Sequence, residues 1–278
     1  MGKLEGKVVL VTGGNGGLGA GIVKGFLEEG AKVAFCGRSE EKNQEVYAKF
    51  QALGELLAIQ CDIANSGDVQ KMFEQVVKHF GTLDILVNNA AVTGGRGMHK
   101  GNGKTDRENF LDLTTLPGKK FSLEITKNMS DQEWEDCIQV NLNGLFYCTR
   151  EALKIMEAKN YGKIINIASI AGISNQSAHS PAYAAAKGGV VAFTKNLAVE
   201  VAGAGVLVNA VAPGAIQTPG FERFMEAAGP EVSERMKQTC PLNRLGTIEE
   251  HASLVVYLAT DDANYITGQV ITTNGGMF

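Results

Sequence analysis

The sequence predicts an α/β fold of the doubly wound type, in which a parallel sheet lies between two layers of helices. Three observations support this prediction. Apolar, β-branched runs alternate with helical stretches, and within most runs apolar residues follow one another instead of alternating with polar ones. Glycines cluster where the first run meets the first helix. Continuous apolar strands separated by helices are typical of a parallel sheet buried on both faces. The expected architecture is a three-layer α/β/α sandwich.

The expected elements follow one another along the chain. The strand "KVVLVT" precedes a helix, "KVAFC" precedes a charged amphipathic helix, and "LLAIQC" precedes a third helix before "LDILVN". The strands "KIINIA", "VLVNAVA" and "QVITT" continue the series. The expected strands are 7–12, 32–36, 56–61, 83–88, 163–168, 206–212 and 269–273, and the expected helices include 17–29, 40–53, 66–80, 141–157 and 181–202. No internal repeat or low-complexity linker interrupts them, so we expect one domain over residues 1–278.

The composition excludes several classes of protein. The chain has 278 residues and a formal net charge of −4, so it lacks the basic excess of a nucleic-acid-binding surface. No apolar run approaches the roughly 20 residues of a membrane span. The N-terminus "MGKLEGKVVLVTGG" has neither a signal-peptide pattern nor a myristoylation signal. The five cysteines are scattered, without metal-ligand spacing. We expect a cytoplasmic protein with reduced thiols, no metal, and no nucleic-acid or membrane partner.

One long segment breaks the alternation of strands and helices. About 35 residues with little periodicity separate Asn89 from the helix that begins near Ser130. Connections in such folds usually take about 2 to 6 residues. This segment also follows the carboxyl end of a strand, the edge at which open α/β sheets bind ligands. We expect residues 93–127 to form an inserted loop that covers the substrate side and selects the substrate.

The glycine cluster points to a cofactor. The stretch "VLVTGGNGGLGAG" places Gly13, Gly17 and Gly19 between a strand and a helix. Glycine allows a tight turn and close approach of backbone N–H groups to a pyrophosphate, and the helix N-terminus adds partial positive charge. The spacing, GxxxGxG, differs from the commoner GxGxxG. A tight turn alone would need similar residues, but their place at the first strand–helix junction favours dinucleotide binding.

The end of the second strand bears on the choice of dinucleotide. An acidic residue there would bind the ribose 2′-hydroxyl of NAD, whereas a nearby arginine accommodates the 2′-phosphate of NADP. This chain offers Gly37, Arg38 and Ser39. Gly16 in the turn supplies no second cation, and Arg38 could instead be a solvated surface charge. We expect NADP as the cofactor, with NAD as the alternative.

A tyrosine and a lysine stand four residues apart in "SPAYAAAKGGVVAFT". On a helix, Tyr183 and Lys187 would share one face. A positive charge beside a phenol favours the phenolate and lowers the tyrosine pKa from its usual value of about 10. We therefore expect Lys187 to lower the pKa of Tyr183, so that the phenol can exchange a proton at neutral pH. Such a pair can also arise by chance, so its meaning depends on the groups around it.

Several motifs together resemble the short-chain dehydrogenase/reductase family. In chain order they are "TGGNGGLG" (12–19), "CDI" (61–63), "NNAA" (88–91), "VNLNG" (140–144), "IINIAS" (164–169), "YAAAK" (183–187), "NAVAPGAIQT" (209–218) and "YITGQVITTNGG" (265–276). They span nearly the whole chain, and their order and spacing are more specific than any one of them. The resemblance implies a compact Rossmann fold that transfers a hydride between a nicotinamide cofactor and a secondary alcohol or ketone.

The resemblance assigns catalytic roles to four residues. Tyr183 would be the general acid in ketone reduction and the general base in alcohol oxidation. Lys187 would assist it and bind the nicotinamide ribose. Ser169 would hydrogen-bond the carbonyl oxygen, and Asn141 would hold a water that relays protons to Lys187. Other interpretations are that Ser169 merely ends a strand and that Asn141 caps or bends a helix. His179, just before the catalytic helix, is either near substrate or on the surface.

The resemblance also assigns cofactor contacts along the strand ends. Asp62 and Ile63 would contact the adenine, and Asn88 and Ala90 would lie along the cofactor, with Asn88 also stabilising the sheet. A loop after the sixth strand would hold the nicotinamide end. The full expected set is Gly13, Asn15, Gly17, Leu18, Gly19, Arg38, Ser39, Asp62, Ile63, Asn89, Ala90, Tyr183, Lys187, Pro213, Gly214, Ile216 and Thr218.

Two departures from the family pattern concern the substrate. Ala91 replaces the glycine of the usual "NNAG", and the loop 93–127 has no family-wide counterpart. Residues 214–240 resemble the family's substrate lid, in which apolar side chains either line a pocket or pack a core: Phe221, Phe224, Met225 and Met236. Basic residues in the long loop would suit an anionic substrate if the loop leans over the site: Arg96, His99, Lys100, Lys104 and Arg107.

The substrate and the function class stay open at this point. A hydroxysteroid fits an apolar lid with a basic rim, and a sugar acid or polyol fits a polar loop. The alternatives are a 3-oxoacyl-thioester reductase and a non-catalytic NADP-binding sensor. An epimerase or dehydratase would need a longer C-terminal substrate domain. Small and apolar outward positions on helices 141–157 and 181–202 predict a homotetramer or homodimer.

Overall fold

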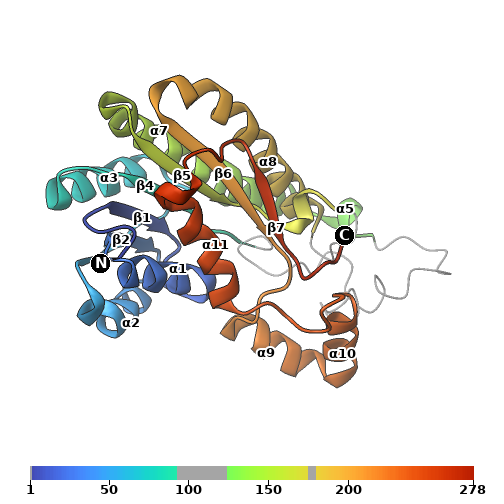
Figure 1. Ribbon diagram of the computed structural model, residues 1–278. Helices are drawn as coiled ribbons and strands as arrows, with labels where there is room; N and C mark the ends of the chain where they lie inside the picture. Colours follow the sequence, from blue (N-terminus) through green and yellow to red (C-terminus); the bar gives the residue numbers. More distant parts are fainter. Residues whose placement is uncertain (1, 93–123, 175–179) are drawn as a thin grey trace.

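A seven-stranded sheet forms the centre of the protein in the computed structural model, which describes residues 2–92, 124–174 and 180–278 (Figure 1). All strand pairs are parallel, in the order β3-β2-β1-β4-β5-β6-β7. The strands are β1 (Val8–Thr12), β2 (Lys32–Gly37), β3 (Leu56–Gln60), β4 (Ile85–Asn88), β5 (Gly162–Ile167), β6 (Val206–Pro213) and β7 (Val270–Thr273). The order reverses between β1 and β4, which creates the crevice where such sheets bind ligands. The predicted fold class is confirmed.

Helices cover both faces of this sheet, as Figure 1 shows. One face packs against α1 (Gly17–Glu28), α2 (Glu40–Phe50) and α11 (Ile248–Ala259). The other packs against α3 (Ser66–Phe80), α7 (Leu145–Met156) and α8 (Pro181–Val201). Because the central strands are apolar on both sides, they are buried between these two layers.

The start of α8, the helix that carries Tyr183 and Lys187, follows from its sequence. The hydroxyl of Ser180 accepts a hydrogen bond from the backbone N–H of Tyr183 at 3.2 Å and so caps α8. Proline occupies the first helical position, where its missing N–H costs no hydrogen bond. The helix therefore begins at Pro181, and Tyr183 lies in its first turn.

The structure corrects two of the expected helices and shows how the predicted lid is built. The second helix ends at Phe50, and a 3₁₀ turn, η1 (Gln51–Leu53), completes the predicted range. The helix predicted from residue 141 begins at Leu145, because a π-helical segment, η2 (Gln139–Gly144), lies between it and α6 (Asp131–Ile138). The predicted lid contains two helices, α9 (Pro219–Ala228) and α10 (Pro230–Gln238). Before α6 lies a short helix, α5 (Ile125–Asn128).

Residues 93–123 of the expected loop lie outside the described residues, together with their basic side chains, and so does His179. Within the described residues, no helix has the length and apolar character needed to cross a membrane.

Candidate active site

The four expected catalytic residues come from three elements at the carboxyl edge of the sheet. Ser169 follows β5 and caps the short 3₁₀ helix η4 (Ile170–Gly172), which packs against α8. Tyr183 and Lys187 lie in α8, and Asn141 lies in η2, which also packs against α8. All four side chains are buried. The fold therefore gathers residues that are far apart in the sequence.

Burial controls the proton chemistry of Tyr183. Its pKa is raised to about 12, because burial disfavours the phenolate more than a hydrogen bond with Ser169 favours it. The Cys137 thiol nearby raises the pKa further. The expectation that Lys187 lowers the pKa of this tyrosine is wrong for the protein alone. At neutral pH Tyr183 therefore holds its proton.

Lys187 is one of the largest fully buried side chains of the described structure. Its ammonium donates a hydrogen bond to the Ile167 carbonyl at 2.7 Å and lies 5.7 Å from the centroid of the Tyr183 ring. Burial lowers the pKa of Lys187 to about 8. The two neighbouring groups are thus both shifted toward their neutral forms, for the same physical reason.

Asn141 links two segments of the site by hydrogen bonds. Its Nδ2 donates to the carbonyls of Val92 at 2.8 Å and Cys137 at 2.9 Å, and its Oδ1 accepts from the Val92 N–H at 3.2 Å. These bonds tie the segment after β4 to the π-helical segment. The structure gives Asn141 this bracing contact, and the expected water relay to Lys187 stays a prediction.

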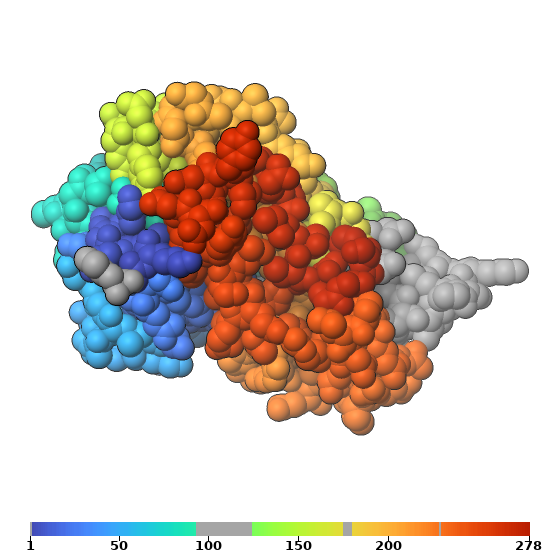
Figure 2. Space-filling model, viewed as in Figure 1, coloured from blue at the N-terminus to red at the C-terminus, as the bar shows by residue number. Residues whose placement is uncertain are grey.

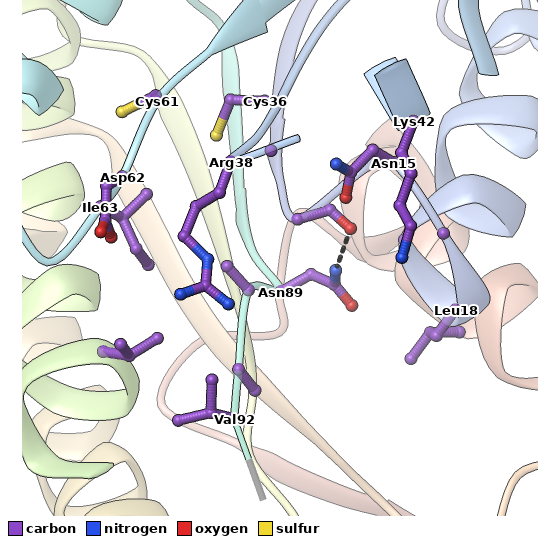
Figure 3. Close-up of a pocket in the computed structure, with 17 residues that line it drawn as sticks. Asn15, Leu18, Cys36, Arg38, Lys42, Cys61, Asp62, Ile63, Asn89 and Val92 are labelled. Carbon is purple, nitrogen blue, oxygen red and sulfur yellow. Dashed lines mark hydrogen bonds between the residues drawn. The ribbon is translucent and has the colours of Figure 1, made fainter. Parts of the chain in front are cut away.

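A cavity of about 340 Å³ opens at the carboxyl ends of β1, β2 and β3 (Figure 3). Of the expected cofactor residues that precede β5 in the chain, most belong to its lining. The lining residues are Gly13, Asn15, Gly16, Leu18, Gly19, Cys36, Gly37, Arg38, Lys42, Cys61, Asp62, Ile63, Asn89, Ala90, Ala91, Val92 and Val140. In Figure 3 the side chains of Arg38 and Lys42 extend in the same direction, into the cavity.

The glycine-rich turn is shaped for close backbone approach. Gly13 has a φ of +64°, and a Cβ at this position would lie 2.7 Å from the Ala90 Cα. The Asn89 amide donates to the Gly13 carbonyl at 3.0 Å, the bond drawn in Figure 3. Asn88, by contrast, is buried in the sheet and bonds Thr149 and Asn166. Asn88 thus braces the sheet, whereas Asn89 lines the cavity.

Several expected cofactor residues lie outside the cavity lining. The Ser39 hydroxyl caps α2 by accepting from the Lys42 N–H at 3.3 Å. The others lie at or after the end of β6, in the glycine turn, or in α8: Gly17, Pro213, Gly214, Ile216, Thr218, Tyr183 and Lys187. Their cofactor contacts stay predictions. A Cβ on Gly17 would lie 3.6 Å from the Thr218 methyl group, so the glycine turn and the β6 loop are neighbours.

Lys42 is a charged residue of the cavity lining that the sequence analysis did not identify. It supplies the second cation that Gly16 does not, from the first turn of α2. Within the described part of the chain, no carboxylate forms an ion pair with Arg38 or Lys42.

The apolar residues of the expected lid mostly pack on one another. Phe224 of α9 and Met236 of α10 both pack against the buried Val232 of α10, so the two helices contact each other there. The rings of Phe221 and Phe224 lie 5.8 Å apart, and Met225 is buried. The lid therefore has a small core of its own, so core packing accounts for most of these side chains.

Comparison with known proteins gives consistent matches over the chain. A family model described as short chain dehydrogenase matches residues 7–115, and one described as enoyl-(acyl carrier protein) reductase matches residues 119–278. The 3-oxoacyl-[acyl-carrier-protein] reductase FabG of Staphylococcus aureus is 38% identical over 275 residues, with 98% of each chain covered. FabG of Escherichia coli is 34% identical over 276 residues, with 99% of each chain covered. The crystal structure of gox2181 matches with a TM-score of 0.84 at 27% identity, covering 99% of this chain and 97% of that one.

Proposed function

Because the chain belongs to the short-chain dehydrogenase/reductase family, we propose that it reduces the 3-oxo group of an acyl thioester to a 3-hydroxyacyl thioester, with NADPH as reductant. The observation that carries this proposal is the full-length similarity to 3-oxoacyl-[acyl-carrier-protein] reductases. The comparisons do not support a hydroxysteroid, sugar acid or polyol as substrate. They favour the thioester alternative.

The cofactor is NADP, and the residues around the cavity fit it. Arg38 and Lys42 both reach the cavity and can bind the 2′-phosphate, while Gly37 places no carboxylate where it would repel that group. Asp62 and Ile63 line the same cavity and would hold the adenine. Gly13 and Gly16 of the glycine turn line the cavity before the N-terminus of α1, where backbone N–H groups would bind the pyrophosphate.

The protonation of the site suits reduction. NADPH, when bound, supplies the hydride to the carbonyl carbon. Tyr183 keeps its proton at neutral pH and gives it to the carbonyl oxygen as negative charge develops there. Ser169, which bonds Tyr183, orients the same oxygen. Lys187, with a pKa of about 8, can return a proton to the phenolate.

The burial of these groups argues against a sensor that only binds nucleotide. A fully buried lysine is costly to desolvate, and the Lys187 ammonium has one described hydrogen bond, to the Ile167 carbonyl. A binding protein could fill this position with an apolar side chain. An acid–base catalyst, by contrast, needs both the phenol and the amine there.

The experiment is a substrate screen with purified protein. Consumption of NADPH, followed by its absorbance, is measured with acetoacetyl thioesters of coenzyme A and of acyl carrier protein, and with a 3-ketosteroid and a keto sugar acid. A crotonyl thioester is included because the C-terminal family model names an enoyl reductase. We expect the 3-oxoacyl thioesters to give the highest kcat/KM. Turnover of the steroid or the sugar acid with no thioester reduction would overturn the proposal.

A further inference from the structure

A buried amide in α2 lies behind the adenosine end of the cavity. Asn43 is fully buried, although it lies on a helix whose other polar residues are mostly exposed. Burying a primary amide is unfavourable unless its polar atoms are hydrogen-bonded. The partners of Asn43 therefore indicate why an amide is held there.

The Asn43 side chain joins three segments of the cavity wall. Its Nδ2 donates to the carbonyl of Gly37, at the end of β2, at 3.1 Å. The same Nδ2 donates to the carbonyl of Ile59, near the end of β3, at 3.2 Å. Its Oδ1 accepts a hydrogen bond from Nδ2 of Asn15, in the glycine turn, at 2.9 Å. Both amide protons and one acceptor site are used, so the contacts fix the orientation of this side chain.

These contacts hold Asn15 against the Cα of Gly37. A Cβ at position 37 would lie 1.9 Å from Nδ2 of Asn15, so a side chain at this position would have to displace the end of the Asn15 side chain. Position 37 is the strand end at which an acidic residue would bind the ribose hydroxyls of NAD. The hydrogen bond from Asn15 to Asn43 opposes that displacement, and so it opposes an acidic residue at position 37.

The same amide fixes the two cations of the cavity. Arg38 follows Gly37, whose carbonyl accepts from Asn43, and Lys42 precedes Asn43 in α2. Anchoring α2 to the ends of β2 and β3 therefore sets where both charged side chains begin. Arg38 and Lys42 both line the cavity, whereas Asn43 does not.

We propose that Asn43 is a positioning residue that determines the preference for NADP over NAD, by holding Asn15 over Gly37 and by placing Arg38 and Lys42 on one cavity. The inference rests on NADP being the cofactor of the proposed function. It concerns binding alone, so it can be tested without the substrate.

The first test replaces the amide by an apolar group of similar size. Dissociation constants of NADPH and NADH are measured by titration of fluorescence for wild type, Asn43→Leu and the control Gln44→Leu, an exposed neighbour on the same helix. Asn43→Leu should lower the preference for NADPH about five- to tenfold, as expected from lost hydrogen bonds that position a charged contact. The control, Gln44→Leu, should keep the wild-type preference for NADPH. A merely structural role would weaken both cofactors equally, and an unchanged ratio in folded Asn43→Leu overturns the proposal.

The second test does not depend on the folding of Asn43→Leu. It asks whether Asn15, in the place where Asn43 holds it, opposes a side chain at position 37. Gly37→Asp alone should weaken both NADPH and NADH, because the new side chain collides with Asn15. Gly37→Asp with Asn15→Gly should bind NADH more tightly than wild type does. If Gly37→Asp alone binds NADH as tightly as the double variant, Asn15 does not exclude the side chain and the proposal fails. A wild type that binds neither cofactor would instead refute the proposed function.

Discussion

Tyr183 and Lys187 lie four residues apart, but burial rather than their mutual charge sets their pKa values. The phenol is shifted up to about 12 and the amine down to about 8. The spacing could be predicted from the sequence, because it needs only a helix. The direction of the tyrosine shift could not, because desolvation depends on the strands and helices that cover α8.

The lowered pKa of Lys187 predicts how stability depends on pH. In the unfolded chain this lysine keeps its proton up to about pH 10.5, whereas in the folded protein it loses the proton at about pH 8. Between these values the unfolded state binds more protons, so the free energy of unfolding rises with pH. Wild type should show this rise, and Lys187→Met should lack it.

Chemical denaturation of the protein without cofactor, at several values between about pH 7 and pH 10, measures this difference. Lys195→Met, an exposed lysine on the same helix, should behave like wild type. Parallel curves for wild type and Lys187→Met would show that the amine is not desolvated as the structure indicates.

Some residues of the cavity wall could be predicted from the sequence, and others could not. Arg38 could be found because it follows a strand end where phosphate binding is decided. Lys42 lies on a helix, where a lysine usually means a solvated face, and only the packing of α2 beside β2 turns it toward the cavity. Asn43 was missed because its role comes from hydrogen bonds to Gly37, Ile59 and Asn15, which only the folded structure shows.

At the scale of elements, apolar runs predicted the strands because a buried parallel strand needs apolar residues on both faces. The predicted start of α3 at Ser66 agrees with the cap by Asn65, whose side chain accepts from the N–H groups of Gly67 and Asp68. The π-helical segment η2 was not predicted, because it has no composition or periodicity of its own. It arises where Asn141 bonds Val92 and the Cys137 carbonyl.

The start of α11 carries a buried histidine that predicts a second pH effect. Nδ1 of His251 lies 2.6 Å from Oγ1 of Thr273, and within the described residues its Nε2 has no hydrogen-bond partner. A Cβ at Gly246 would lie 2.4 Å from that Nε2, and Gly246 bridges to Ile216 in the loop after β6. A charged imidazole would bury an unsatisfied N–H beside this bridge.

Burial accordingly lowers the pKa of His251, although the neighbouring Glu250 raises it. The unfolded state then binds more protons below the ordinary histidine pKa of about 6.5, so stability falls as pH falls through the folded value. Wild type should therefore lose stability on acidification from about pH 7 to pH 5 more steeply than His251→Gln. Thermal unfolding in matched buffers checks this, with the exposed His79→Gln as control. Equal pH slopes for His251→Gln and wild type would contradict it.

At the scale of the whole molecule, α7 and α8 form a continuous outer surface, coloured yellow-green and orange in Figure 2. This surface exposes apolar groups: Phe146 is 42% exposed and Val199 is 82% exposed. The Phe146 ring also meets that of Phe193 on α8, with centroids 6.4 Å apart. Large exposed apolar groups on adjoining helices are typical of protein–protein interfaces.

We predict that two copies of the chain pair through this surface, as a homodimer or within a homotetramer. Light scattering should give a mass of about two or four times 29.5 kDa. Val199→Glu should lower the mass, because it places like charges across a two-fold axis, whereas Glu200→Gln should not. A mass near 29.5 kDa for wild type at micromolar concentration would refute the prediction.

The most direct test of the central claim is the turnover of a 3-oxoacyl thioester by Tyr183→Phe. Loss of the phenol proton should lower kcat about 100- to 10,000-fold, the usual contribution of general acid catalysis, while NADPH still binds. Tyr265→Phe, at a fully exposed tyrosine, should match wild type. If Tyr183→Phe reduces the thioester at a near-normal rate, another group is the general acid. The roles proposed for Ser169, Tyr183 and Lys187 would then be wrong.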